Sequence, residues 1–112
     1  MLEKVRQINV NMNTGAVHFD DKITFMDGDD KVAVIQLRGE LDDNIKAVLR
    51  VQPPQGEVIE VPGKPVPYKS IAREFEVPTN IGVGKYKCQL KLTASFRKNM
   101  SEIFEYEVLP SL

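Results

Sequence analysis

Apolar and polar residues alternate most clearly between Gly84 and Ser95, in the run GKYKCQLKLTAS. Its apolar side chains share one parity, whereas its lysines and other polar side chains share the other. Successive side chains of a β-strand point to opposite faces, so this run predicts a strand with one buried and one solvated face. The predicted buried set comprises Tyr86, Cys88, Leu90, Leu92 and Ala94.

A second alternating run, Phe104 to Val108, carries Glu105 and Glu107 on its polar parity. The polar link at 96–101 is short enough to join the two runs as an antiparallel hairpin. Such a hairpin sets lysines of one strand against glutamates of the other, which favours the pairing.

The rest of the chain contains further short strands separated by turn residues. The run at 31–38 is apolar at most positions, as expected of a strand buried on both faces. The proline-rich connector at 62–67 is expected to stay outside the sheets because proline donates no backbone hydrogen bond. Turn signals recur every 8–12 residues or so, and the pattern predicts an all-β, immunoglobulin-like antiparallel β-sandwich of about seven to nine short strands. The other expected extended segments are 5–12, 16–19, 23–26, 45–52, 57–61 and 68–77.

Length and composition indicate one globular domain. Of the 112 residues, 42% are hydrophobic and 28% are charged, which suffices for a core without disulfides. We expect residues 1–109 to form one β-sandwich domain and residues 110–112 to begin a C-terminal linker, so that the native protein continues beyond Leu112. The net charge of −1 without a basic run argues against a nucleic-acid partner. Neither a membrane-spanning apolar stretch nor a signal peptide is evident, so we expect no membrane partner and synthesis in the cytoplasm.

Tyr86 and Cys88 form the clearest structural motif. A tyrosine two residues before a cysteine resembles the F strand of immunoglobulin-type domains, where the tyrosine hydroxyl bonds back to a corner. The second cysteine and the core tryptophan are missing, because Cys88 is the only cysteine and the chain has no tryptophan. We therefore expect a tyrosine corner, with Cys88 as a small buried hydrophobe and not a reactive thiol.

The chain shows no convincing catalytic or metal-binding set, and we expect a non-enzymatic protein without cofactors. His18 is the only histidine, and its neighbours Asp20 and Asp21 are typical of a solvated turn. The acidic segments 27–30 and 42–44 lack the ligand spacing of an EF-hand, so ordinary turns are favoured while calcium binding stays open. The Gly82-x-Gly84 pair precedes a strand and is interpreted as a turn.

Four large apolar residues lie in short N-terminal segments: Met12, Phe19, Phe25 and Met26. We expect most of them to be in the core and one or two to lie on an exposed edge that contacts a partner protein. Methionine and aromatic residues are enriched at such interfaces.

Three stretches resemble the N-terminal domain of upper baseplate proteins from tailed phages that infect Gram-positive bacteria. Phe19 to Leu37 is similar to the family's opening strands, which flank a Gly-Asp turn. The run GKYKCQL from Gly84 and the run SEIFEYEV from Ser101 are similar to its closing hairpin.

The resemblance implies a phage or prophage structural protein of the virion tail, made in the bacterial host cytoplasm. Its N-terminal domain would anchor to the baseplate hub and connect it to receptor-binding proteins, with a homo-oligomer possible in the full-length protein. Two alternatives stay open. A carbohydrate-binding or adhesin-type sandwich would need an aromatic platform, for example at Tyr68 or Tyr106, and a hydrolase would need His18 to meet a nucleophile.

Overall fold

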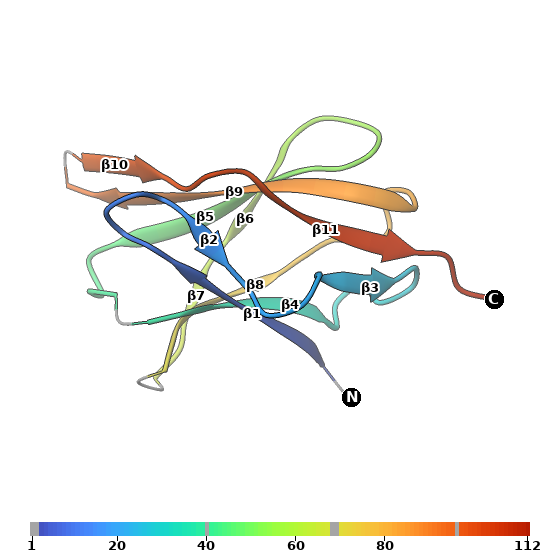
Figure 1. The fold of residues 1–112 in the computed structure, drawn as a ribbon, viewed down its shortest axis with the longest axis horizontal. Helices are drawn as coiled ribbons and strands as arrows, with labels where there is room; N and C mark the ends of the chain where they lie inside the picture. Colours follow the sequence, from blue (N-terminus) through green and yellow to red (C-terminus); the bar gives the residue numbers. More distant parts are fainter. Residues whose placement is uncertain (1–2, 40, 68–69, 96) are drawn as a thin grey trace.

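The computed structural model describes residues 3–39, 41–67, 70–95 and 97–112. Within these ranges the chain forms eleven strands and no helix, so no described helix could cross a membrane (Figure 1). The strands are β1 (Lys4–Val10), β2 (Val17–His18), β3 (Thr24–Met26), β4 (Ala33–Arg38), β5 (Lys46–Gln52), β6 (Ile59–Pro62), β7 (Lys64–Pro65), β8 (Ile71–Glu76), β9 (Gly84–Ala94), β10 (Arg97–Met100) and β11 (Phe104–Leu109).

The strands form two layers. Sheet A has the order β2-β1-β4-β8-β7, and sheet B has the order β3-β11-β9-β5-β6, with β10 pairing with β9. The inward-facing side chains of both sheets share one hydrophobic core. The predicted all-β sandwich is confirmed.

The strands are not all antiparallel, which corrects one part of the prediction. β1 runs parallel to β4, and β3 runs parallel to β11. Parallel neighbours need a crossover connection, and here the chain supplies it by passing from β2 in sheet A to β3 in sheet B before returning to β4.

The predicted hairpin of β9 and β11 is confirmed, with Lys87 opposite Glu105 and Lys85 opposite Glu107. The polar link between them differs from the prediction, since its residues 97–100 form β10, which pairs antiparallel with the C-terminal end of β9. Three of the four β10 side chains are exposed, so this strand lacks the apolar alternation that marks a half-buried one.

The proline-rich connector also differs from the prediction, because it enters both sheets. Pro62 ends β6, and Pro65 belongs to β7, which pairs with β8. Both positions lie on edge strands, where a proline interrupts no central ladder. Gly63 carries the chain from sheet B to sheet A, and its N–H donates to the Ala47 carbonyl at 2.9 Å.

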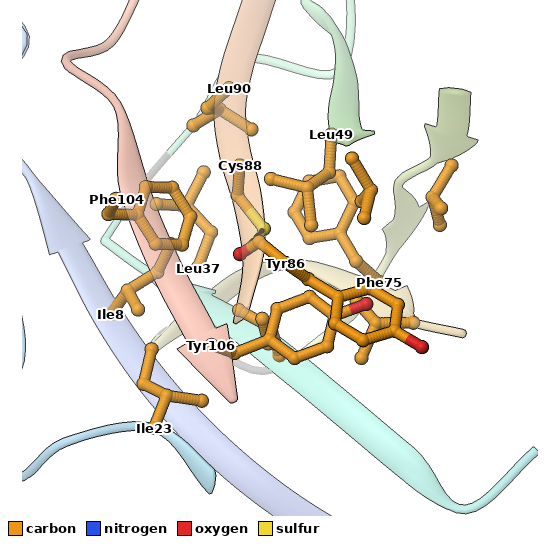
Figure 2. Close-up of a cluster of buried hydrophobic side chains, with 14 of the residues drawn as sticks. Ile8, Ile23, Leu37, Leu49, Phe75, Tyr86, Cys88, Leu90, Phe104 and Tyr106 are labelled. Atoms are coloured by element: carbon orange, nitrogen blue, oxygen red, sulfur yellow. Dashed lines mark hydrogen bonds between the residues drawn. The ribbon is translucent and has the colours of Figure 1, made fainter. Parts of the chain in front are cut away.

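The interior of the sandwich is continuous and largely apolar (Figure 2). The strand β4 is buried from Ala33 to Leu37, as expected of a strand covered on both faces. The core-facing parity of β9 matches the sequence pattern from Tyr86 to Leu92, whereas Ala94 is only partly buried. The largest fully buried side chains are Tyr86, Tyr106, Phe25 and Phe75.

Candidate functional site

Tyr86 closes a tight corner at the start of β9. Its hydroxyl donates to the Gly82 carbonyl at 2.7 Å and accepts a hydrogen bond from the Ile81 N–H at 3.0 Å. Burial raises the pKa of Tyr86 above its ordinary value, although the bond from Ile81 opposes the shift. The Tyr86 hydroxyl is therefore neutral and makes two hydrogen bonds, so its role in the corner is structural.

Cys88 lies in the core, two residues further along β9. Its side chain is 1% exposed, and its Sγ lies 3.8 Å from the Tyr86 carbonyl oxygen. Burial raises the pKa of the Cys88 thiol far above its ordinary value. The thiolate, which is the reactive form, is therefore suppressed.

Phe25 corrects one of the predicted partner contacts, because it is 2% exposed. Pairing of β3 with β11 turns its ring into the core, where it meets the Tyr106 ring edge-on at 5.7 Å between centroids. The Arg6 guanidinium covers the Phe25 ring at 5.4 Å from its centroid. Met26 is partly buried, whereas Met12 and Phe19 are exposed.

The two exposed residues line different hollows of the surface. Phe19 lies beside a cleft of about 480 Å³ between the segment 17–23 and β11, which also includes Ile103 and Glu105. Met12 lines a smaller hollow of about 110 Å³ near Met100, between the β1–β2 turn and the β9–β10 hairpin. Both hollows combine apolar and polar side chains, as protein-binding surfaces do.

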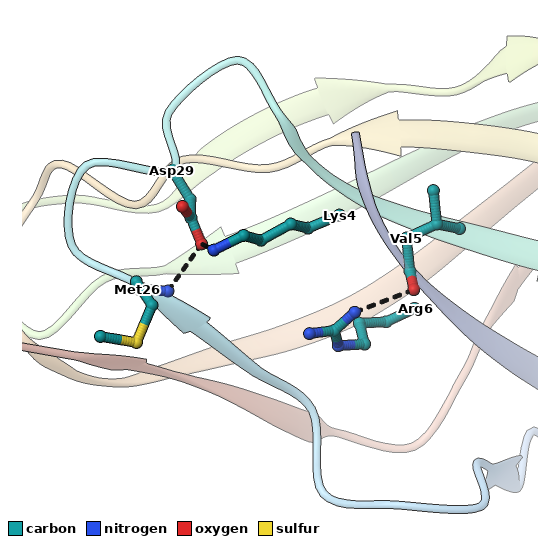
Figure 3. Close-up of polar contacts among 5 residues, drawn as sticks. All are labelled: Lys4, Val5, Arg6, Met26 and Asp29. Atoms are coloured by element: carbon teal, nitrogen blue, oxygen red, sulfur yellow. Dashed lines mark hydrogen bonds and ion pairs between the residues drawn. The ribbon is translucent and has the colours of Figure 1, made fainter. Parts of the chain in front are cut away.

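Asp29 uses its carboxylate to hold the turn between β3 and β4 (Figure 3). Its Oδ2 accepts hydrogen bonds from the Met26 N–H at 2.8 Å and from the Lys4 ammonium at 3.0 Å. Burial opposes the negative charge, but the bonds from Met26 and Lys4 outweigh it and lower the pKa of Asp29. Lys4 thus places a positive charge next to this carboxylate.

In the second acidic segment, residues 42–44, an aspartate side chain also stabilises a turn. The Asp42 side chain accepts the Asn44 N–H at 3.0 Å, an Asx turn. Within the described residues, no group of three or more His, Cys, Asp and Glu side chains could hold a metal ion.

The residues named for the two alternative functions lie in different environments. His18 is exposed on the two-residue edge strand β2, whereas the Cys88 thiol lies in the core. Tyr106 is 1% exposed and cannot stack on a sugar, which corrects its assignment as an aromatic platform. Tyr68, the other platform residue, lies outside the described residues.

Sequence reasoning missed two residues. Arg73 is 5% exposed, and its guanidinium donates to the carbonyls of Ala72 at 2.8 Å and Ile45 at 2.7 Å. Its position on the apolar parity of β8, between Ile71 and Phe75, was the available signal. Ile103 is 64% exposed and borders the Phe19 cleft, and its only sequence signal is that it breaks the alternation before Phe104.

No protein-family model and no curated protein matches this sequence. Among solved structures, the chain is similar to the N-terminal domain of phage TP901-1 ORF48, with a TM-score of 0.62 and 14% sequence identity. The match covers 97% of this chain and 99% of the phage domain. The two share their fold. The more specific immunoglobulin-like assignment stays a prediction.

Proposed function

We propose that this chain is a non-enzymatic structural protein of a phage or prophage tail. The observation that carries the proposal is the end-to-end match with a phage domain, which leaves almost no residue of either chain outside the shared fold. A likeness of two sheets alone would be a weaker argument, because many unrelated proteins are β-sandwiches. Here the match covers 97% of a chain that contains the parallel pairs β1–β4 and β3–β11 and the antiparallel pair β9–β11.

The more specific part of the proposal is an N-terminal baseplate-anchoring domain that connects the tail hub to receptor-binding proteins. Two lines of support agree on a phage N-terminal domain. One is the resemblance of the segments Phe19–Leu37, Gly84–Leu90 and Ser101–Val108 to upper baseplate proteins. The other is the solved structure, which is itself an N-terminal domain of a phage protein.

An anchoring role would depend on surfaces and not on a reactive centre. The core is continuous and the loop before β9 is fastened by tyrosine hydroxyls, so the sandwich presents its edges and faces in fixed positions. Exposed apolar side chains such as Met12, Phe19 and Ile103 provide contact area at two of its edges. Rigid surfaces bind with little loss of conformational freedom, which suits a component of a particle.

The test is to find the protein in particles. Tail-containing particles are induced from the strain that encodes the gene, purified on a density gradient and labelled with gold-conjugated antibody against this domain. We expect label at the tail tip in electron micrographs, and an adjacent set of tail genes in the genome. Particles with complete tails that lack the protein would contradict the proposal.

A further inference from the structure

The outer face of sheet B carries an excess of positive charge. Residues directly opposite each other in neighbouring strands point to the same side of a sheet, so the strand register identifies the side chains of this face. It comprises six basic residues, Lys46, Arg50, Lys85, Lys87, Lys91 and Lys98, and three acidic residues, Glu60, Glu105 and Glu107.

Two of the three acidic side chains are already neutralised. The Glu60 carboxylate lies 3.1 Å from the Lys91 ammonium and 3.7 Å from the Arg50 guanidinium. The Glu107 carboxylate is bound at 2.6 Å by Lys22, which lies outside this set. Among the described residues, no ion pair involves Lys46, Lys87 or Lys98, which are exposed lysines of this face.

This charge is local to one layer of the sandwich. The whole chain has a net charge of −1. The strands β4, β7 and β8 of sheet A contribute two basic residues to its outer face, Arg38 and Lys64, and two acidic ones, Glu74 and Glu76, so their charges balance. The two faces therefore differ in the partners that they would attract.

A shallow hollow of about 170 Å³ lies within the basic face. Arg50 and Lys87 contribute cationic side chains to it, and Val58 and Ile103 contribute aliphatic ones. Val58 is 42% exposed and belongs to the β5–β6 loop, which projects from sheet B (Figure 1), while Ile103 is 64% exposed. Cations beside exposed aliphatic groups suit a carboxylate that is followed by an apolar side chain.

We propose that the outer face of sheet B binds an acidic segment of a neighbouring tail protein. Carboxylates of the partner meet Lys87 and the other lysines of this face that form no ion pair among the described residues, and an apolar side chain of the partner rests between Val58 and Ile103. Complementary charge speeds association and excludes partners of like charge. The inference relies on the proposed tail role for the identity of the partner as a tail protein, and on the charge of this face for its acidity.

Zero-length cross-linking of purified particles tests the contact directly. A carbodiimide joins a lysine amine to a carboxylate only where the two already touch, and mass spectrometry identifies the joined peptides. We expect Lys46, Lys87 or Lys98 joined to aspartate or glutamate of another tail protein. Cross-links to that protein from Lys31 or Lys64 alone would place the contact elsewhere and overturn the proposal.

Charge reversal provides the second test. Lys87→Glu and, separately, Lys46→Glu are supplied in trans to a strain lacking the gene, with Lys64→Glu on sheet A as the matched control. All three side chains are exposed, so only small changes in thermal unfolding are expected. Lys87→Glu faces Glu105 and Lys64→Glu faces Glu74, so the control carries a comparable like-charge contact. We expect each sheet B variant to reduce the protein per particle at least about tenfold, whereas the control remains at the wild-type level.

The outcomes separate the two proposals. If the wild-type protein is absent from particles, the proposed tail role itself is refuted. If the wild-type protein is present and the Lys87→Glu and Lys46→Glu variants are incorporated normally, only the proposed role of the basic face is refuted. Saturable binding of a random-sequence DNA duplex, lost in both variants, would assign the face to nucleic acid and equally refute an acidic protein partner.

Discussion

The rings of Tyr86 and Tyr106 stack in the core, with centroids 4.8 Å apart and planes inclined by 20° (Figure 2). The two residues lie directly opposite each other on β9 and β11. Both hydroxyls reach the same loop, since Tyr86 donates to the Gly82 carbonyl at 2.7 Å and Tyr106 to the Pro78 carbonyl at 2.6 Å. The stacked pair thus fastens the β8–β9 loop to sheet B.

Removing the Tyr106 hydroxyl is expected to destabilise the domain. Tyr106→Phe leaves the Pro78 carbonyl without this bond, and we expect a loss of about 1–3 kcal/mol in the free energy of unfolding measured in urea. Tyr86→Phe should cost a comparable amount, because its hydroxyl both donates and accepts. Wild-type stability in both variants would show that the hydroxyls do not fasten the loop.

The same pair is expected to limit stability at alkaline pH. Burial raises the pKa of both Tyr86 and Tyr106 in the folded protein. Their contribution is fully present below the unfolded tyrosine pKa of about 10 and is lost as the pH rises above it. Phenolate absorbance of two tyrosines should therefore appear together with loss of the β-sheet circular dichroism signal. Their ionisation in a protein that stays folded would contradict this expectation.

Adjacent substitutions on β9 distinguish its two faces. Leu90 is fully buried, so Leu90→Ala should cost about 2–5 kcal/mol in the free energy of unfolding. Lys91 points outward and only pairs with Glu60 at the surface, so Lys91→Ala should change it by at most about 0.5 kcal/mol. Similar losses in the two variants would mean that the faces are assigned wrongly.

Gly63 is expected to tolerate no side chain at the crossing from β6 to β7. A Cβ at this position would lie 2.9 Å from the Phe75 ring and 3.0 Å from the Ala47 carbonyl oxygen. Gly63→Ala should therefore destabilise the domain by about 1–3 kcal/mol in thermal or urea unfolding. Phe75→Leu in the same chain should recover part of that loss, relative to Phe75→Leu alone. Additive effects would indicate that the ring is not the obstacle.

Asp29 is expected to make stability depend on acid pH. Its pKa is lowered in the folded protein because the bonds from Met26 and Lys4 outweigh burial. Its contribution is fully present above the unfolded value of about 3.9 and is lost as the pH falls through the lower folded value. The free energy of unfolding, measured from neutral pH to pH about 3, should fall less steeply in Asp29→Asn than in wild type. Asp43→Asn, at an exposed position, is the control for a lost surface charge.

Parity along the chain was enough to predict the sandwich and its central hairpin. In β9 the apolar positions from Tyr86 to Leu92 recur every second residue, and this period alone decides which side chains face a core. The lysines and glutamates on the other parity predicted the pairing of β9 with β11. The tyrosine-corner geometry depends on residues within five positions of Tyr86, so a local motif was informative there as well.

Parity did not indicate the parallel neighbours, and the tertiary structure alone decided these pairings. The parallel pairings of β1 with β4 and β3 with β11 depend on how the whole sheets pack, and they bury Phe25 although its segment is only three residues long. The polar strand β10 forms because β9 offers it a backbone ladder, not because of its own side chains. The basic face likewise gathers Lys46, Lys87 and Lys98 from three strands. The positive charge of this face results from the pairing of distant segments, so the sequence pattern of any one segment could not predict it.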